Sequence, residues 1–290
     1  MSQYSNKYIL NLFRATFILI LIFVARSSVA QPLSNSDSEA RIRQWLLEGI
    51  ELYRTRADAQ TIMSFYAEKQ LGIPYKAGLL EKPGSESLVV TLEGSDCVIY
   101  VETTLALMMT TMVGSYSYDT FERSLSLIRY RNGTIDGYHS RLHYFGDWLV
   151  DGQNKRLISV LFQEERFPKI QPYHFMSSNR SSYPALADDN TLEEIRNAEK
   201  RLNEDLLYYI PTDKIPDVLN ELQTGDIVAF VTKVPGLDFS HTAVIKRDND
   251  RVGFWHASTT GAVIVESKTL YDYTKDRSSL LGIVIGRPNF

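Results

Sequence analysis

The sequence predicts an α+β protein, with helices in the first part of the chain and a sheet at its end. Apolar residues recur at steps of three and four between residues 38 and 131, which is typical of helices that bury one face. From Thr224 onward the pattern changes to short β-branched or apolar runs, separated by glycines and charged turns. With 290 residues, the chain is long enough to build one sizeable core.

Residues 1–30 are typical of a secretory signal peptide. The basic residues Lys7 and Arg14 precede an apolar run from Ala15 to Ala25. Ser28-Val29-Ala30 then supplies small residues at the positions that a signal peptidase recognises. The apolar run is short for a membrane span, which needs about 20 residues. We therefore expect residues 31–290 to form a single exported domain, with no stable membrane insertion after the signal is removed.

Charge and cysteine content narrow the class of protein. Without its first 30 residues the chain would carry 28 basic and 35 acidic side chains, a net charge of −7, which is unfavourable for binding nucleic acid. A single cysteine excludes an internal disulfide. Export without disulfides is typical of a bacterial envelope protein with a large core, so we expect the periplasm of a Gram-negative bacterium. We expect no cofactor and no bound metal.

Residues 31–135 are expected to form the helical part of the domain. A helix is predicted over residues 38–70, and Leu71-Gly72 ends it. Residues 86–92 are predicted to form a short strand. A further helix is predicted over Tyr118–Arg131, where Asn132-Gly133 follows as a break.

Cys97, the only cysteine, is predicted to lie in the first turn of a helix. Gly94-Ser95-Asp96 is typical of a turn and a helix cap, and the apolar residues after it repeat with helical spacing. Unpaired backbone N–H groups and the positive end of the helix dipole stabilise a thiolate there, which lowers the cysteine pKa and favours nucleophilic attack. The alternative is a buried cysteine that acts as a small apolar residue.

Residues 136–222 are expected to hold a substrate-binding wall, an insertion and a helix. The stretch 137–148 is dense in polar and aromatic side chains, which is costly to bury without partners and typical of a binding surface. Residues 150–185 have weak periodicity, and we interpret them as an insertion or a lid. A charged amphipathic helix is predicted over Thr191–Tyr209, with Thr191 to Glu194 as a capping box.

Residues 223–290 are expected to form a curled antiparallel sheet of five to six strands. The five runs with strand character are Asp226–Thr232, Thr242–Lys246, Val252–His256, Ala262–Glu266 and Leu281–Ile285.

Two of the five histidines fall at the ends of predicted strands. His241 opens one strand and His256 closes the next, so a hairpin would bring them together at one end of the sheet. A thiol nucleophile needs a base to take its proton, and the base needs a polar group to orient it. Cys97, His241 and His256 could fill these roles in that order. Alternatively, His241 is an edge histidine with satisfied hydrogen bonds and His256 is a surface residue.

These motifs together resemble the NlpC-type papain-like cell-wall hydrolases. The motifs that carry the resemblance are Asp96-Cys97 at a helix start, Gly225-Asp226 before a strand, Ser240-His241 and His256-Ala257-Ser258. Within that superfamily the chain is most similar to the N-acetylmuramoyl-L-alanine amidase-like branch. The further matches are Ile73-Pro74-Tyr75 with Gly78, Val101-Glu102 and Ser140-Arg141-Leu142-His143-Tyr144. The resemblance spans roughly residues 60–290 and implies a papain-like core with the cysteine helix packed on the sheet.

The resemblance also implies the reaction. The expected enzyme cleaves the amide between the lactyl group of N-acetylmuramic acid and L-alanine in small peptidoglycan fragments, with anhydro muropeptides as substrates. Cys97 would attack the carbonyl, His241 would act as base and then as acid, and His256 would orient the imidazole. The oxyanion would lie near the Cys97 backbone N–H.

The residue after the cysteine bears on specificity. Peptidases of this superfamily usually carry a serine there, which helps to hold a free peptide amine. Val98 cannot make that hydrogen bond, which favours the amidase. The alternative is a γ-D-glutamyl-diamino-acid endopeptidase.

Six residues are candidates for substrate binding: Tyr75, Asp96, Tyr138, Arg141, His143 and Ser240. Arg141 could hold a substrate carboxylate through two hydrogen bonds, and Tyr75 could close over the reacting carbonyl. Alternatively, Arg141 and Asp147 form a surface ion pair.

Two other functions stay open. His139 and His143 are four residues apart and could present two zinc ligands on one helix face, as in a zinc amidase, although no glutamate lies between them to act as base. The other possibility is a catalytically inactive envelope-binding protein that keeps the hydrolase scaffold.

Overall fold

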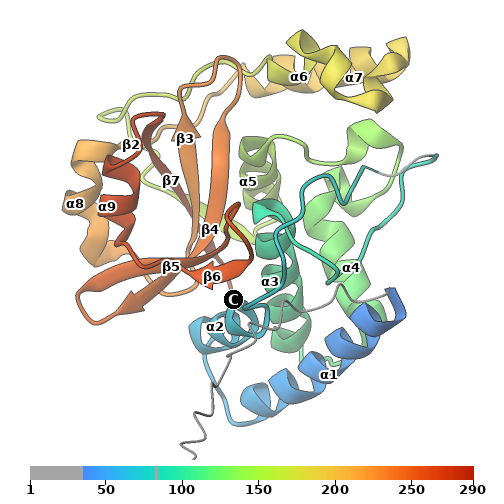
Figure 1. The fold of residues 1–290 in the computed structure, drawn as a ribbon, viewed down its shortest axis with the longest axis vertical. Helices are drawn as coiled ribbons and strands as arrows, with labels where there is room; N and C mark the ends of the chain where they lie inside the picture. The colour runs from blue at the N-terminus through green and yellow to red at the C-terminus, as the bar shows by residue number, and fades with distance from the viewer. Residues whose placement is uncertain (1–34, 82–83) are drawn as a thin grey trace, which may run out of the picture.

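The computed structural model describes residues 35–81 and 84–290, so the predicted signal peptide lies outside the described residues. A group of helices packs against one antiparallel sheet (Figure 1). The helices are α1 (Asn35–Arg54), α2 (Ala59–Lys69), α3 (Cys97–Met112), α4 (Tyr118–Arg129), α5 (Phe145–Asn154), α6 (Phe175–Ser178), α7 (Asp189–Leu202), α8 (Ile215–Val218) and α9 (Leu270–Lys275). The strands are β1 (Ile158–Leu161), β2 (Ile210–Pro211), β3 (Ile227–Thr232), β4 (Phe239–Asp248), β5 (Arg251–Ala257), β6 (Val263–Val265) and β7 (Leu280–Pro288).

The sheet is open, and its strand order is β1-β7-β3-β4-β5-β6. The five strands predicted from the sequence are β3 to β7, and all their pairings are antiparallel. The predicted count of five to six strands is too low, because β1 and the two-residue β2 both pair with β7. A two-residue strand carries no periodicity, so the sequence pattern could not reveal β2.

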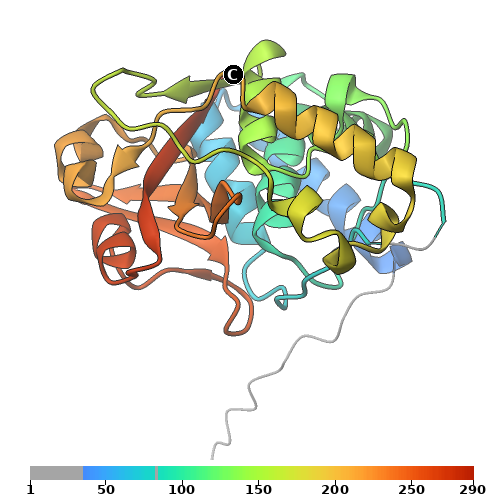
Figure 2. The ribbon, with the colours of Figure 1, turned by 90° about the horizontal axis from the view of Figure 1, so that it is seen from above.

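The central strand β3 is buried on both faces. Its side chains alternate, so that Ile227, Ala229 and Val231 pack in a core shared with α1 to α5, whereas Val228 and Phe230 pack with α8 and α9. Figures 1 and 2 show this arrangement, with α8 and α9 on one side of the sheet and α3, α4 and α5 on the other. The helix α7 lies over the helical half of the molecule in both views.

The predicted helix over residues 38–70 is two helices. Arg56 adopts a φ of 61° between them, which ends α1. Asp58 then caps α2, because its side chain accepts a hydrogen bond of 2.8 Å from the Thr61 backbone N–H.

The predicted strand over residues 86–92 does not form. No strand of the described chain lies beside this segment, and side chains bond its backbone instead. Tyr130 Oη donates to the Ser87 carbonyl (3.0 Å), and Arg129 Nη1 donates to the Val89 carbonyl (2.5 Å). The β-branched composition was therefore misleading, because strand formation needs a neighbour that the sequence does not specify.

Residues 150–185 contribute to the main structure instead of forming a separate lid. They supply the end of α5 and the strand β1, and three of their apolar side chains, Ile170, Tyr173 and Met176, are buried in the core. The following helix α7 is shorter than predicted and ends at Leu202. Its cap is Asp188, which accepts a hydrogen bond from the Thr191 N–H, so the predicted capping box is wrong.

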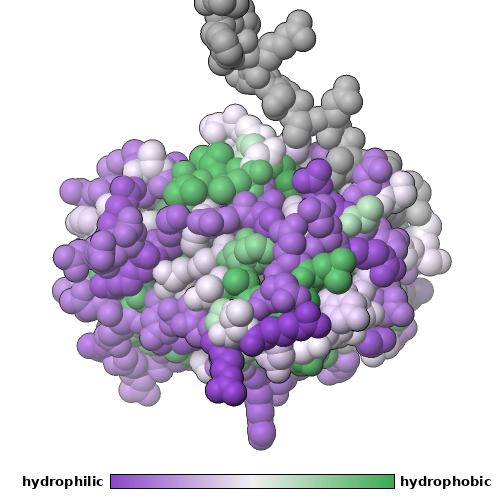
Figure 3. Space-filling view, turned by 90° about the horizontal axis from the view of Figure 1, so that it is seen from below, coloured by the Kyte–Doolittle hydropathy of each residue, from purple (hydrophilic) through white to green (hydrophobic). Residues whose placement is uncertain are grey.

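The surface seen from below is mainly hydrophilic, with several apolar areas between the polar side chains (Figure 3). In the part of the chain that the structure describes, no helix combines the length and apolarity that crossing a membrane requires.

Glu102 and Arg129 form a buried ion pair that connects α3 to α4. Glu102 Oε2 lies 2.7 Å from Arg129 Nε, and both side chains are 2% exposed. Burial raises the pKa of Glu102, although the charge of Arg129 opposes this effect. Because both charges have left water, removal of one would leave the other buried and uncompensated.

We predict that Glu102→Gln lowers the free energy of unfolding by about 3 kcal/mol, because Arg129 would keep its charge without a counter-ion. Guanidinium denaturation followed by tryptophan fluorescence measures this loss. The matched control is Glu51→Gln, which breaks an exposed pair with Arg54 and should cost less than about 1 kcal/mol. Equal effects of the two substitutions would contradict the prediction.

Candidate active site

Cys97 is the first residue of α3, as the sequence predicts. Asp96 is the N-cap, and its Oδ1 accepts hydrogen bonds from the backbone N–H groups of Val98 (3.0 Å) and Ile99 (2.8 Å). These bonds satisfy two of the unpaired N–H groups at the helix start and fix the turn that carries the thiol. Asp96 therefore acts as the cap of α3, and its role in substrate binding stays a prediction.

Tyr75 lies beside the cysteine turn. Tyr75 and Ser95 form a parallel bridge, and the Ser95 N–H donates to the Pro74 carbonyl (2.9 Å). Burial raises the pKa of Tyr75, and the charges of Cys97 and Asp96 add to this effect, which indicates that the phenol is close to the thiol. The bridge places the Tyr75 backbone beside the turn that carries Cys97, and closure of its side chain over the reacting carbonyl stays a prediction.

The two histidines at the ends of β4 and β5 are hydrogen-bonded to each other. His241 Nε2 lies 2.8 Å from His256 Nδ1, and the two rings meet edge to face with centroids 5.0 Å apart. The antiparallel register of β4 and β5, in which Val244 pairs with Trp255, brings them together as the predicted hairpin requires. His256 is only 3% exposed, so the alternative of a surface residue is wrong.

Glu266 extends this pair, and sequence analysis did not assign it a role. Its Oε2 lies 3.5 Å from His256 Nε2. Its Oε1 accepts hydrogen bonds from the Lys268 N–H (3.0 Å) and the Ser267 hydroxyl (3.1 Å), which hold the carboxylate in place. The available signal was an acidic residue at the end of the strand predicted to follow His256.

The thiol of Cys97 lies next to the start of β4. The backbone N–H of Thr242, the residue after His241, is close enough to the sulfur to lower its pKa, as are the N–H groups of Cys97 and Val98. Burial nevertheless raises the pKa of Cys97 to about 12, with the Asp96 charge as the second cause. The expectation that the helix start lowers this pKa is therefore wrong for the site without substrate, because desolvation outweighs the N–H groups.

Both histidines are neutral at pH 7. Burial lowers the pKa of His241 to about 3 and that of His256 to about 4, and the nearby charge of Arg277 acts in the same direction on both. A neutral His241 can accept a proton. Within the described chain no hydrogen bond joins Cys97 to His241, and such contacts often shorten only when substrate binds.

A cavity of about 420 Å³ opens onto the histidines. Its lining includes the predicted residue Ser240, together with His241, His256, Glu266, Tyr273 and Arg277. The cavity therefore combines a neutral base, its partner histidine, a carboxylate and a guanidinium on one surface.

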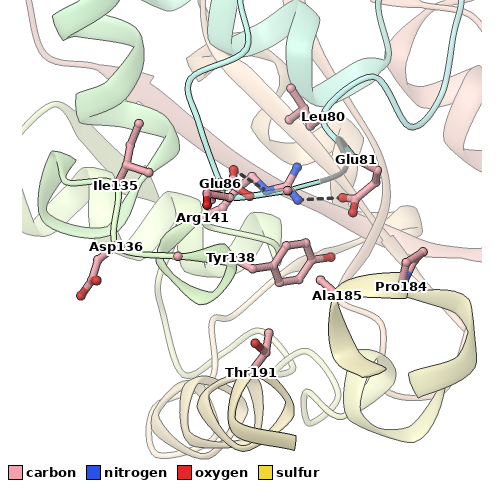
Figure 4. Close-up of a pocket in the computed structure, with 13 residues that line it drawn as sticks. Leu80, Glu81, Glu86, Ile135, Asp136, Tyr138, Arg141, Pro184, Ala185 and Thr191 are labelled. Atoms are coloured by element: carbon pink, nitrogen blue, oxygen red, sulfur yellow. Dashed lines mark hydrogen bonds and ion pairs between the residues drawn. The ribbon is translucent and has the colours of Figure 1, made fainter. Parts of the chain in front are cut away.

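Two of the other predicted binding residues, Tyr138 and Arg141, line a second cavity, of about 760 Å³ (Figure 4). Tyr75, Asp96 and His143 line neither this cavity nor the one at the histidines. Here Arg141 is held between two carboxylates, with Glu81 2.7 Å and Glu86 3.5 Å away. Its guanidinium carbon also lies 4.9 Å from the centre of the Tyr138 ring. Because Arg141 is already paired and 5% exposed, the prediction that it holds a substrate carboxylate is wrong. The alternative pair with Asp147 is also wrong, since Asp147 bonds to Arg131.

His143 supports Tyr138 and has no contact with the histidine pair. Its Nε2 lies 2.8 Å from the Tyr138 carbonyl oxygen, and the two rings are 4.2 Å apart. His139 belongs to a short 3₁₀ turn, Tyr138–Ser140, and His143 lies outside any helix. The two side chains therefore do not share a helix face, which was the premise of the zinc-amidase interpretation.

The sequence matches the model of a family described as N-acetylmuramoyl-L-alanine amidase-like over residues 66–283. No curated protein matches the sequence.

Several solved structures are similar to this fold. One is an N-acetylmuramoyl-L-alanine amidase from Bacteroides uniformis, with a TM-score of 0.75 and 32% identity, which covers 80% of this chain and 99% of its own. Another is a candidate xylanase from Bacteroides fragilis, with a TM-score of 0.72 and 33% identity over 77% of this chain and 98% of its own. A Legionella pneumophila protein, LPG0564, shares the fold at a TM-score of 0.62 and 21% identity, over 87% of this chain and 96% of its own.

We predict that the alkylation rate of Cys97 by iodoacetamide keeps rising up to pH 10, because the thiol stays protonated at neutral pH. As Cys97 is the only cysteine, the mass of the modified protein reports on this site alone. A short unstructured peptide with one cysteine, whose thiol has a pKa of about 8.5, serves as the reference. A rate that levels off below pH 8 would show an ionised thiolate and contradict the prediction.

Proposed function

The chain belongs to the N-acetylmuramoyl-L-alanine amidase-like family, and on this premise we propose that it is a cysteine amidase acting on peptidoglycan fragments. Its bond would be the amide between the lactyl group of N-acetylmuramic acid and L-alanine, in small anhydro muropeptides. The observation that carries the proposal is the placement of Cys97 beside the start of β4, where His241 is hydrogen-bonded to His256.

The proposed reaction begins with both groups neutral. The Cys97 thiol transfers its proton to His241 while the sulfur attacks the lactyl carbonyl, and the Cys97 backbone N–H at the start of α3 stabilises the oxyanion. The protonated His241 then gives the proton to the departing amine of L-alanine, which leaves a thioester on Cys97. Water, deprotonated by the same imidazole, hydrolyses the thioester and restores the thiol.

His256 and Glu266 are proposed to orient the base. His256 Nδ1 is hydrogen-bonded to His241 Nε2, so Nδ1 of His241 remains available to accept the proton of the thiol. Glu266 lies at the far end of His256, at 3.5 Å, and favours the tautomer with a proton on His256 Nε2. In that tautomer His256 Nδ1 accepts a hydrogen bond from His241 Nε2–H, which leaves His241 Nδ1 as the free base.

The neighbourhood of Cys97 supports the amidase over the γ-D-glutamyl-diamino-acid endopeptidase. Val98 packs against the core and offers no side-chain hydrogen bond to a free peptide amine. Its backbone N–H is already used by the Asp96 cap.

The second cavity gives no support for xylanase activity, which is the activity in the name of the Bacteroides fragilis neighbour. Glycoside hydrolysis needs two carboxyl groups that flank the bond, one of them able to donate a proton. In the second cavity, the carboxylates of Glu81 and Glu86 both pair with the Arg141 guanidinium (Figure 4). They therefore do not form such a pair of catalytic carboxyl groups.

Two further features of the sequence belong to the same proposal. The cysteine at a helix start, packed on an antiparallel sheet that carries the histidines, supports a papain-like core of the NlpC type. The pattern of residues 1–30 supports export to the periplasm of a Gram-negative bacterium.

We predict that the purified protein cleaves an anhydro muropeptide into its sugar and its free peptide, as followed by mass spectrometry. Cys97→Ala should lower the rate at least about 1,000-fold, because the reaction has no other nucleophile, and a metal chelator should leave the wild type fully active. Activity that survives Cys97→Ala but is lost with chelator would overturn the thiol mechanism. Cleavage within the peptide would keep the mechanism and establish the endopeptidase.

We predict that Glu266→Gln lowers kcat about tenfold and leaves KM and the melting temperature unchanged, because the substitution removes a charge that orients His256 without changing the shape. Glu68→Gln, which loses an exposed carboxylate on α2, is the control and should keep full activity. A wild-type kcat for Glu266→Gln would exclude the orienting role.

A further inference from the structure

Arg277 lies on the same cavity as the catalytic histidines, directly after α9. Its guanidinium carbon is 3.3 Å from the centre of the Tyr273 ring, and Nη1 donates to the Tyr273 carbonyl (2.9 Å). These two contacts fix the guanidinium before any ligand arrives, which lowers the conformational entropy lost on binding.

Arg277 forms no ion pair within 4.0 Å in the described part of the chain. The buried or half-buried arginines 129, 131, 141 and 287 all pair with carboxylates, whereas the half-buried Arg247 bonds to the backbone carbonyls of Leu219 and Leu222. Arg277 is half-buried like these, yet among the described residues no carboxylate lies within 4.0 Å of it, and one carbonyl oxygen is its only hydrogen-bond acceptor. Most of its five donors are therefore available to a ligand.

The other charged group on the cavity cannot take the place of a ligand. Glu266 is held by the Ser267 hydroxyl, the Lys268 N–H and His256. Both histidines are neutral, so Arg277 supplies the positive charge of the lining. An anion that enters this cavity would meet Arg277 beside the base.

We propose that Arg277 binds a carboxylate of the peptide part of the substrate and so makes this cavity the peptide side of the active site. The inference rests on the proposed function. In a muropeptide cleaved at the lactyl–alanine amide, the lactyl carboxyl is consumed in the bond, so every free carboxylate lies on the peptide. The α-carboxylate of the D-glutamate that follows L-alanine is within about 7 Å of the scissile amide along an extended chain.

This assignment also separates the roles of the two cavities. The guanidinium of Arg141 is neutralised by Glu81 and Glu86, so the second cavity offers no free cation for a carboxylate. The sequence predicts Arg141 as the carboxylate-binding arginine. The proposal assigns this role to Arg277, which lies next to α9 on the opposite side of the sheet.

The test uses two substrates that differ only in charge: anhydro-muramoyl-L-alanyl-D-glutamate and the same compound with both carboxylates converted to amides. We expect the wild type to bind the carboxylate form with a KM about tenfold lower. Arg277→Gln should raise KM for the carboxylate form about tenfold and leave KM for the diamide unchanged. Arg277→Lys should keep part of the preference, because the charge remains without the fork of donors.

Lys275→Gln is the matched control, since it removes a positive charge from α9 at a residue that does not line the cavity. It should keep the full preference. If Arg277→Gln keeps the lower KM for the carboxylate form, or raises KM equally for both substrates, the inference is overturned.

A separate arm distinguishes failure of the inference from failure of the proposed function. Calorimetry measures binding of the peptide L-alanyl-D-glutamate to Cys97→Ala and to the double variant with Arg277→Gln. If the wild type cleaves neither substrate, the proposed function fails, and equal peptide binding by the two variants would overturn the role of Arg277 as well.

Discussion

The contact between the first turn of α3 and the start of β4 is the constraint on which the site depends. Cys97 comes from the helical layer and His241 from the sheet, so neither element can assemble the site alone. The Asp96 cap fixes the turn, the buried Glu102–Arg129 pair fixes the helix against α4, and the antiparallel register of β4 and β5 fixes the histidine pair. The catalytic geometry is thus a consequence of how the two layers pack.

Burial sets the charge state of the site. Desolvation raises the pKa of Cys97 and lowers the pKa of His241 and His256, so the thiol and both imidazoles are neutral at pH 7. In this account the proton moves only when the sulfur attacks, because a thiolate–imidazolium pair would be costly in the empty site. The fixed Cys97 N–H at the start of α3 then stabilises negative charge as it develops. Arg277, which forms no ion pair within 4.0 Å among the described residues, lies where it favours the neutral form of both histidines.

Much of the fold and the three central residues could be predicted from the sequence, because they depend on local patterns. The five strands of the last part of the chain show alternation, and the cysteine turn has a cap followed by helical spacing. The glycine of Gly225-Asp226 also has a local cause, because Gly225 adopts a φ of 93°. Partners distant in sequence could not be predicted. Arg141 meets Glu81 and Glu86, and Glu266 meets His256, only through tertiary packing and strand register.

The most direct test of the central claim is the mass of the protein when an anhydro-muropeptide reaction is quenched in acid within milliseconds. We expect a thioester that adds the acyl sugar, N-acetyl-anhydromuramoyl, to the peptide containing Cys97. An adduct that carries a peptide acyl group would contradict the proposed bond. Turnover without any adduct at Cys97, at all quench times, would contradict nucleophilic catalysis by this thiol.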